Sequence, residues 1–209
     1  MRTTAKGRGS KEPGAGVTAP IPRPRERILA AAADLFYRHG IRAVGVEAIA
    51  EAAGTNKMTL YRHFASKDAL VAEYLRQLGQ EIDAEWDEAA KAYVGNPQGE
   101  IRAWLEKVTD CVTSGGEGGC ALANAAVELR DKDHPARAVI EEFKTRHRNR
   151  LVRLFRDAGL AEPEGLADEI FLLIEGARIN IQSVGPDGPG SRLVGMIQAM
   201  IDSHARPQR

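Results

Sequence analysis

Two short helical patterns joined by a glycine constrain the fold of this chain more than any other feature of its sequence. Residues 46–53 carry apolar side chains at helical spacing, and Gly54 ends that pattern. Asn56 is a suitable N-cap for a second helix over about 57–63, because its side-chain oxygen can accept from an orphan backbone N–H. That second segment is polar and basic, with too few apolar residues to serve as a core helix. Its exposed side must therefore have another use.

A longer helical pattern comes before these two. It begins at Arg25, with Pro24 at or near the first turn, and ends at Gly40 after an apolar stripe that includes Ile28 and Phe36. Together the three segments predict a helix-turn-helix, in which Leu60 and Phe64 supply the apolar contribution of the third helix. The other side of that helix is small, polar and basic, which suits the major groove of DNA.

The rest of the chain also predicts helices only. A long fourth helix is expected from the Ser66 cap to about Tyr93. Glycine- and proline-rich breaks then separate five further helices at roughly 98–114, 119–130, 135–158, 163–184 and 189–205. The sequence therefore predicts an all-α protein of about nine helices, with a three-helix DNA-binding domain over 25–70 and a second helical domain over 71–209.

The composition supports this fold class. Hydrophobic residues make up 43% of the 209 residues and aromatic residues only 5%, and alternating strand patterns are missing. No apolar run approaches the roughly 18 residues of a membrane helix, and the basic N-terminus lacks the apolar segment of a signal peptide. The two cysteines, Cys111 and Cys120, show no CxxC spacing. A reducing cytoplasmic location is the expectation.

The charges are distributed unevenly although they sum to zero. Residues 1–70 hold 12 Lys and Arg against 6 Asp and Glu, whereas the remainder holds 17 against 23. A basic first third indicates contact with a polyanion, although basic tails are common and often have no specific role. Residues 1–24 are rich in Gly, Pro, Arg and Lys, and we expect a disordered basic tail there because such a segment buries too little apolar surface to offset its ordering entropy.

Residues 25–70 resemble the N-terminal DNA-binding domain of the TetR family of transcriptional regulators. The resemblance lies in RERILAAAADLFYRHG and in VEAIAEAAGTNKMTLYRHFASKDAL, including the Thr59-Leu60-Tyr61 step and Ser66-Lys67. It implies a homodimeric regulator, most simply a repressor, that binds a double-stranded DNA operator and a small-molecule effector. It also implies that residues 71–209 are the ligand-binding and dimerisation domain. Beyond residue 70 the resemblance concerns architecture and no specific motif.

The resemblance also implies roles for individual residues. Tyr61 is expected to hydrogen-bond a phosphate, Thr59 and His63 to contact the DNA backbone, and Lys67 to add its charge at the start of the fourth helix. Lys57 can donate to guanine O6 or N7, and Met58 can pack on a thymine methyl. The full set of expected DNA contacts is Thr55, Asn56, Lys57, Met58, Thr59, Tyr61, Arg62, His63 and Lys67.

Two positions depart from the family pattern. Val44 and Gly45 stand where members of the family often carry Thr or Ser, whose hydroxyls cap the second helix and touch phosphate. Gly45 can cap only weakly, so one backbone contact is expected to be lost. Met58 stands where a small residue is common, which is expected to alter base preference.

The remaining residues show no catalytic or metal-binding constellation. The five histidines form neither HxxxH nor HExxH, and no strand precedes the glycine-rich 115–119 segment, so catalytic residues, metals and cofactors are not expected. A helical bundle can enclose a pocket, and each candidate lining residue has plain core packing as its alternative. Those candidates are Trp86, Trp104, Val108, Cys111, Leu122, Asn124, Phe143, His147, Leu151, Phe171, Glu175 and Arg178. For the last two, an intrahelical ion pair is the alternative to ligand binding.

The last two expected helices each carry an apolar stripe. Such stripes suit a two-fold four-helix interface, with packing inside one chain as the alternative. The expected interface residues are Ile170, Ile174, Ala177, Ile181, Leu193, Ile197, Met200 and Ile201. For the whole chain, the alternative function is a helical small-molecule-binding protein or enzyme that does not use DNA.

Overall fold

A computed structural model describes residues 22–113 and 119–205, and all regular structure within them is helical. The all-α fold and about nine helices are thus confirmed. The expected basic tail lies almost entirely outside the described residues. The elements are α1 (Pro24–His39), α2 (Val46–Ala52), α3 (Lys57–His63), α4 (Lys67–Lys91), α5 (Pro97–Thr113), α6 (Ala121–Glu128), α7 (Pro135–Asp157), α8 (Pro163–Val184), the 3₁₀ helix η1 (Pro189–Arg192) and α9 (Leu193–His204).

Two of the expected helices are shorter than the sequence indicated. α6 begins at Ala121 and ends at Glu128, because Leu129 leaves the helical conformation and its carbonyl accepts from the Arg137 guanidinium at 2.8 Å. The last helix begins only at Leu193, because residues 189–192, which start with a proline, form a 3₁₀ turn instead.

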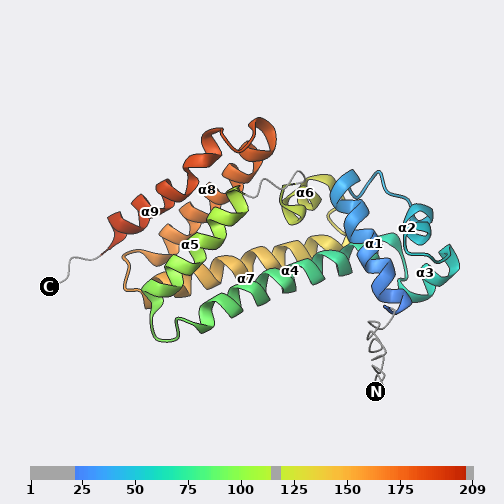
Figure 1. The fold of residues 1–209 in the computed structure, drawn as a ribbon, viewed down its shortest axis with the longest axis horizontal. Helices are drawn as coiled ribbons and strands as arrows, with labels where there is room; N and C mark the ends of the chain where they lie inside the picture. Colours follow the sequence, from blue (N-terminus) through green and yellow to red (C-terminus); the bar gives the residue numbers. More distant parts are fainter. Residues whose placement is uncertain (1–21, 114–118, 206–209) are drawn as a thin grey trace, which may run out of the picture.

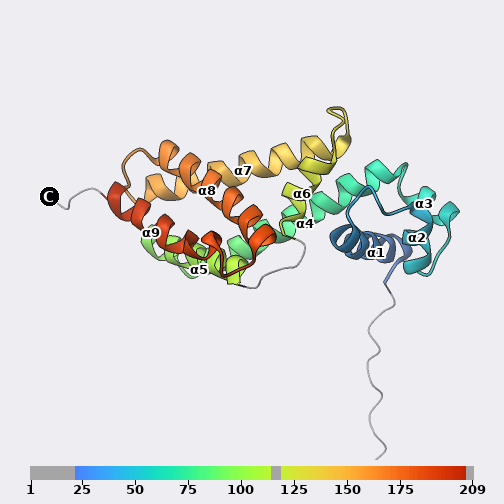
Figure 2. The same cartoon turned by 90° about the horizontal axis from the view of Figure 1, so that it is seen from above.

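Helices α1, α2 and α3 form a small unit, which we call the head. Each of the three helices contributes a fully buried side chain to one apolar cluster. These side chains are Ile28, Ile49 and Leu60. In Figures 1 and 2 the head lies at one end of an elongated molecule, and α9 lies at the other end. Helix α4 starts beside the head and runs into the bundle formed by α5 to α9, which we call the body.

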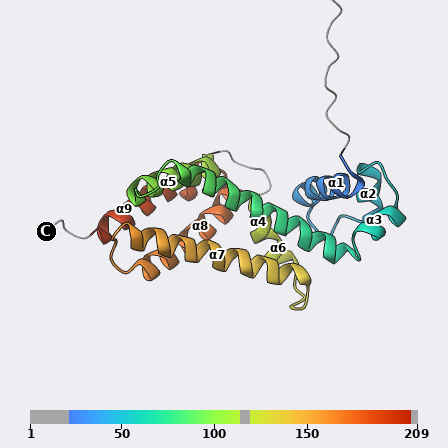
Figure 3. The ribbon, with the colours of Figure 1, turned by 90° about the horizontal axis from the view of Figure 1, so that it is seen from below.

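Helices α4 and α7 form the long axis of the molecule and lie side by side in Figures 1 and 3. Gly79 on α4 makes this close packing possible, because a Cβ atom at that position would lie 3.0 Å from Cδ2 of Phe143 on α7. Apolar burial along this contact is what fixes the direction of α4 relative to the body.

The apolar core has two parts. The first begins in the head and continues through the start of α4, through α6 and into α7 as far as Phe143. The second lies in the body and contains Trp86, Trp104 and Phe155 together with residues of α8 and α9. The head is therefore joined to the body by continuous packing, and the expected boundary at residue 70 stays a prediction. None of the helices in the described part of the chain is both long and apolar enough to cross a bilayer.

Candidate nucleic-acid interface and small-molecule cavity

The turn between α2 and α3 is built around Gly54. Its φ of 60° lies in the left-handed region, where glycine carries no steric penalty. The Thr55 N–H donates to the Ala50 carbonyl at 2.9 Å, and the Arg27 side chain of α1 donates from Nε to the Ala53 carbonyl at 3.1 Å. The turn is thus held both by its own backbone and by a side chain of the first helix, which the sequence alone did not indicate.

The orientation of α3 is fixed by its apolar side and by its cap. Leu60 is fully buried and Phe64 nearly so, as expected for the core side of the helix. Asn56 caps the helix as predicted, since its Oδ1 accepts from the Thr59 N–H at 2.9 Å. The start of α2 has no side-chain cap at Gly45, as expected for a glycine, and the expected loss of a DNA backbone contact there stays a prediction.

The outer side of α3 is exposed. Met58 is 83% exposed and Tyr61 is 42% exposed. Of the other expected DNA contacts, the half-buried ones are Thr55, Thr59 and Lys67. The exposed ones are Asn56, Lys57, Arg62 and His63. The structure therefore brings every predicted contact residue onto one end of the molecule, on or beside α3 (Figure 1).

Glu47 on α2 belongs to the same surface, although the sequence did not single it out. Its Oε1 lies 2.5 Å from Nζ of Lys57, and the Lys57 ammonium lies 6.0 Å from the centre of the Tyr61 ring. The hydrogen bond from Lys57 lowers the pKa of Glu47, and the same bond raises the pKa of Lys57. Both groups are therefore charged at neutral pH.

Lys67 begins α4, and Ser66 caps that helix by accepting from the Ala69 N–H at 3.0 Å. Partial burial lowers the pKa of Lys67, and the carboxylates of Asp68 and Glu128 oppose that effect. The Arg25 guanidinium lies over the Phe64 ring and pairs with Glu73 of α4 at 2.5 Å. These contacts hold the head against the start of α4.

An inner cavity of about 260 Å³ lies in the body between α4, α5, α7 and α8. Seven of the residues predicted to line a pocket do line it: Trp86, Trp104, Val108, His147, Phe171, Glu175 and Arg178. The predicted Phe143 and Leu151 are instead core residues, and Asn124 lines neither this cavity nor the larger one described below. The side chain of Cys111 lies outside the described residues.

His147 stands between aromatic rings in this cavity. Its ring centre lies 4.8 Å from that of Trp86 and 5.4 Å from that of Phe143. Burial lowers the pKa of His147 to about 4, and the charges of Arg178, Arg150 and Lys144 add to this effect while Glu175 opposes it. The imidazole is therefore neutral at pH 7, and its buried Nδ1 finds no hydrogen-bond partner among the described residues.

Glu175 and Arg178 form the intrahelical pair that was the alternative to ligand binding. Arg178 Nη1 lies 3.2 Å from Glu175 Oε1, and Lys144 of α7 pairs with the other carboxylate oxygen. Both residues nevertheless line the inner cavity, so the pair forms part of its polar wall.

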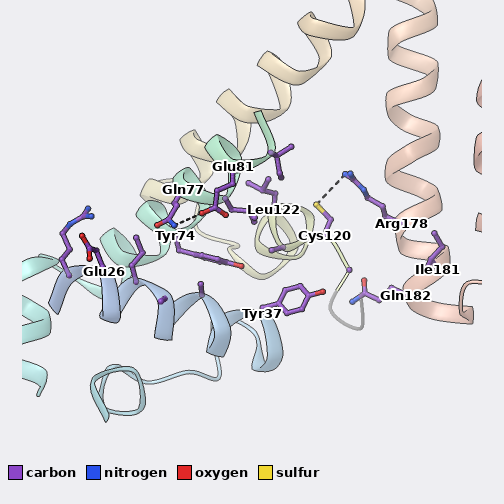
Figure 4. Close-up of a pocket in the computed structure, with 18 of the residues that line it drawn as sticks. Glu26, Tyr37, Tyr74, Gln77, Glu81, Cys120, Leu122, Arg178, Ile181 and Gln182 are labelled. Carbon is purple, nitrogen blue, oxygen red and sulfur yellow. Dashed lines mark hydrogen bonds between the residues drawn. The ribbon is translucent and has the colours of Figure 1, made fainter. Parts of the chain in front are cut away.

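An outer cavity of about 750 Å³ adjoins the inner one and lies where the head meets the body. Tyr37 of α1, Tyr74 of α4, Cys120 and Arg178 line it (Figure 4). Burial raises the pKa of Tyr74 to about 12, so its hydroxyl keeps its proton at neutral pH. Ile82, Arg178 and Ile181 line both cavities. The sequence predicted only Leu122 and Arg178 among the residues of the outer cavity, because its walls come from helices far apart along the chain.

The expected interface residues on α8 and α9 are mostly core residues of the single chain. Five of them are buried within the body: Ile170, Ala177, Leu193, Ile197 and Ile201. Ile174, Ile181 and Met200 are half-buried and pack against the same core. The apolar side chains that these two helices expose are different ones, among them Leu172, Ile179 and Met196. The most apolar stripe of each helix thus faces its own chain, which corrects the expectation for the five buried residues.

The described residues contain no group of three or more His, Cys, Asp or Glu side chains that could hold a metal ion.

Comparison with known proteins agrees with this geometry. Residues 28–74 match the family model described as bacterial regulatory proteins, tetR family. The chain is 30% identical over 122 residues to the transcriptional activator FasR of Mycolicibacterium smegmatis, which covers 56% of this chain and 55% of that protein. It is 31% identical over 118 residues to the transcriptional repressor KstR2 of Rhodococcus jostii, which covers 56% of this chain and 48% of that one. The chain thus spans about half the length of the curated relatives it matches.

Solved structures match over more of the chain. A TetR-family transcriptional regulator from Streptomyces coelicolor superposes with a TM-score of 0.80 at 26% identity, covering 88% of this chain and 96% of that one. A tetR-type transcriptional regulator from Streptomyces avermitilis superposes with a TM-score of 0.74 at 29% identity, covering 88% and 98%. The similarity therefore includes the body as well as the head.

Proposed function

This chain belongs to the TetR family of bacterial regulatory proteins, and on that premise we propose that it is a sequence-specific DNA-binding transcriptional regulator. We further propose that it acts in the cytoplasm as a homodimeric repressor that a small molecule releases from its operator. Repression requires only that the protein occupy the operator, so it needs no additional surface for a partner protein. This function also requires no catalytic residues.

The observation that carries the proposal is the outer side of α3. A seven-residue helix with one fully buried side chain contributes little to the core, yet it presents Lys57, Met58, Tyr61, Arg62 and His63 to solvent. Cationic, hydroxyl and apolar groups on a narrow protruding helix are those that contact phosphates and base edges in a major groove. The N-terminal residues of such a helix are the ones that reach the bases.

We assign the contacts accordingly. Tyr61, Thr59, His63 and Lys67 bind the DNA backbone, and Lys57 and Met58 meet base edges. Arg62 and Thr55 flank these residues and add backbone contacts, and Asn56 serves chiefly as the cap. Backbone contacts fix the register of the protein on DNA, whereas base contacts give it sequence preference.

We place the dimer interface on the exposed sides of α8 and α9. Leu172, Gly176, Ile179 and Ser183 recur at helical spacing along α8, and all four are exposed. Met196 is exposed on α9, which packs against α8. Small and apolar side chains on two neighbouring helices allow close packing against the same helices of a second copy. A dimer is needed because two copies of α3 must reach half-sites about 34 Å apart.

We place the effector in the inner cavity, whose aromatic walls and few polar groups suit a small organic molecule. Helix α4 links that cavity to the DNA contacts, since it carries both Trp86 and Lys67. The corner between α6 and α7 contacts both the head and the start of α4. Glu128 accepts from the Arg42 N–H of the head at 3.1 Å, and His134 Nε2 lies 3.3 Å from Oδ1 of Asp68 on α4. An effector that shifts α4 therefore changes the spacing of the two α3 helices, and it need only favour the released state by a few kcal/mol.

The proposal is tested by fluorescence anisotropy with DNA from upstream of the protein's own gene and with random DNA of the same length. We expect tighter binding to the upstream fragment, and release by molecules that also change tryptophan fluorescence, because both tryptophans of the chain line the inner cavity. If the protein does not prefer the upstream fragment, the operator is sought by selection from random sequences. A folded protein that selects no sequence, and binds neither DNA, would favour the alternative of a small-molecule-binding protein that does not use DNA.

A further inference from the structure

The ion pair between Glu47 and Lys57 is the one place where α2 and α3 meet through charged side chains on the DNA-facing surface. Both side chains are well exposed, at 68% and 53%, and Nζ lies 2.5 Å from Oε1. Burial therefore does not explain the pair. It places a hydrogen-bond donor directly beside an acceptor, at the N-terminal end of the helix proposed to read DNA.

A carboxylate is unexpected on a surface that faces a polyanion. Near phosphates it lowers affinity for any DNA sequence, because like charges repel. Near a base edge it can accept a hydrogen bond only from an exposed amino group, and the N4 amino group of cytosine is its usual partner in the major groove. A carboxylate here therefore costs affinity unless a donor of the DNA faces it.

The pair matches the major-groove edge of one base pair in particular. In a G·C pair the O6 acceptor of guanine and the N4 donor of cytosine are joined by a hydrogen bond, so they lie about 3 Å apart. An ammonium and a carboxylate side by side offer the complementary groups at a similar spacing. Guanine N7 adds a second acceptor on the ammonium side.

The other base pairs match less well. A T·A pair offers an acceptor and a donor in the same order, but the thymine methyl replaces N7 beside the ammonium, and adenine N7 then faces the carboxylate. In the C·G and A·T orientations the donor lies under Lys57 and the acceptor under Glu47. Each of these last two orientations places the Glu47 carboxylate against an acceptor, so it has no hydrogen-bond partner there.

We propose that Glu47 is a specificity-determining residue that, together with Lys57, reads one G·C base pair in each half-site. This inference rests on the proposed function. Lys57 binds O6 and N7 of guanine while Glu47 accepts from N4 of cytosine. The ion pair holds both side chains in place before DNA arrives, which lowers the entropic cost of ordering them.

The test compares the wild-type protein with Glu47→Ala, Glu47→Gln and the control Glu51→Ala. Glu51 is exposed and has the same charge on the same helix, but it has no hydrogen bond or ion pair to Lys57. Sequences are selected from a random pool by each protein, and affinities are then measured for all four base pairs at every position of the selected site. Circular dichroism and thermal melting show that each variant is folded.

We expect the wild-type protein to require G·C at one position of each half-site, with a penalty of roughly tenfold or more for the other pairs. In Glu47→Ala this preference falls to a few-fold while affinity for random DNA rises. Glu47→Gln keeps the preference, because an amide oxygen also accepts from N4, but it gains affinity for random DNA since the charge is gone. Glu51→Ala keeps the wild-type preference.

An unchanged preference at every position in Glu47→Ala would overturn the inference and leave the proposed function intact. A loss of preference in Glu51→Ala equal to that in Glu47→Ala would also overturn it, because general charge would then explain the effect. A wild-type protein that selects no sequence would contradict the proposed function itself.

Discussion

At the scale of single residues, the described surface of α3 differs from an ordinary solvated helix in the variety of its exposed groups. Met58 is almost fully exposed although it is apolar, and Tyr61 is exposed beside a lysine. An exposed methionine gains no favourable contact from water, whereas it can pack on the methyl group of a thymine at a base edge. The exposed apolar side chain is therefore as informative as the charges around it.

The Tyr61→Phe substitution tests the backbone contact assigned to the tyrosine hydroxyl. We expect binding to weaken by roughly tenfold on the selected site and on random DNA alike, because a hydrogen bond to a charged phosphate is lost and no base is read. Anisotropy titrations on both DNAs measure this. A loss confined to the selected site would show instead that Tyr61 reads a base.

His147 gives the body a predictable response to acid. Its folded-state pKa is about 4, below the ordinary value of 6.5, so between these values the unfolded chain binds a proton that the folded chain does not. The free energy of unfolding therefore falls as the pH drops from 6.5 towards 4, by up to about 3 kcal/mol from this group.

Urea unfolding of the wild-type protein and of His147→Asn at pH 7.5 and pH 5 measures this contribution. The difference in unfolding free energy between the two pH values should be smaller in His147→Asn, whereas the same substitution at the exposed His39 should leave it unchanged. Equal acid sensitivity in His147→Asn and the wild-type protein would contradict the assigned cause.

At the scale of helices, the sequence was most informative where glycine and proline mark the ends. Gly40, Gly54 and Pro135 separate helices where the structure separates them. The end of α6 was not predictable, because it depends on Arg137 reaching the Leu129 carbonyl from the next helix. The 3₁₀ turn before α9 was missed because helical periodicity does not distinguish a short 3₁₀ segment from the first turn of an α-helix.

The candidate sites could be predicted only where a single segment of the chain forms them. The residues of α3 were found because one short segment carries the whole surface. The outer cavity was missed because Tyr37 and Tyr74 come together only when α1 packs on α4, and Glu47 was missed because its partner lies across the turn. The interface residues were misplaced because Ile170 and Ile197, the most apolar choices, are those the chain buries for itself.

The Gly79→Leu substitution tests the close packing of α4 on α7. A Cβ atom alone would already lie 3.0 Å from the Phe143 ring, so a leucine must push the two helices apart. We expect the unfolding free energy to fall by roughly 1–3 kcal/mol, measured by urea unfolding. Gly165→Leu in α8 is the control, because nothing lies within 4 Å of a Cβ atom at that position. Equal effects of both substitutions would show that helix packing at Gly79 is not tight.

At the scale of the whole molecule, the proposed function requires two copies of the chain. A single head offers one α3, which contacts too few base pairs to distinguish an operator from other DNA. Helices α8 and α9 lie in the part of the elongated molecule away from the head, so two copies can associate through the body and leave both α3 helices accessible (Figure 1).

The Ile179→Glu substitution tests the proposed dimer interface. Ile179 is 49% exposed on α8, so a carboxylate there leaves one chain folded but is poorly tolerated in an apolar interface. We expect a monomer in analytical ultracentrifugation and a much weaker affinity for the selected site. Val127→Glu on α6, where the valine is 76% exposed, should remain dimeric. A dimeric Ile179→Glu protein would place the interface elsewhere.

DNA binding through the α3 surface is tested most directly by the salt dependence of binding, measured for the wild-type protein and for an Arg62→Ala, Lys67→Ala double variant. We expect the logarithm of the association constant to fall steeply with the logarithm of salt concentration, with a slope of about −0.9 for each phosphate neutralised. The double variant should show a slope shallower by about two such contacts per subunit. A flat dependence in the wild-type protein, or the same slope in both proteins, would contradict DNA binding through the α3 surface.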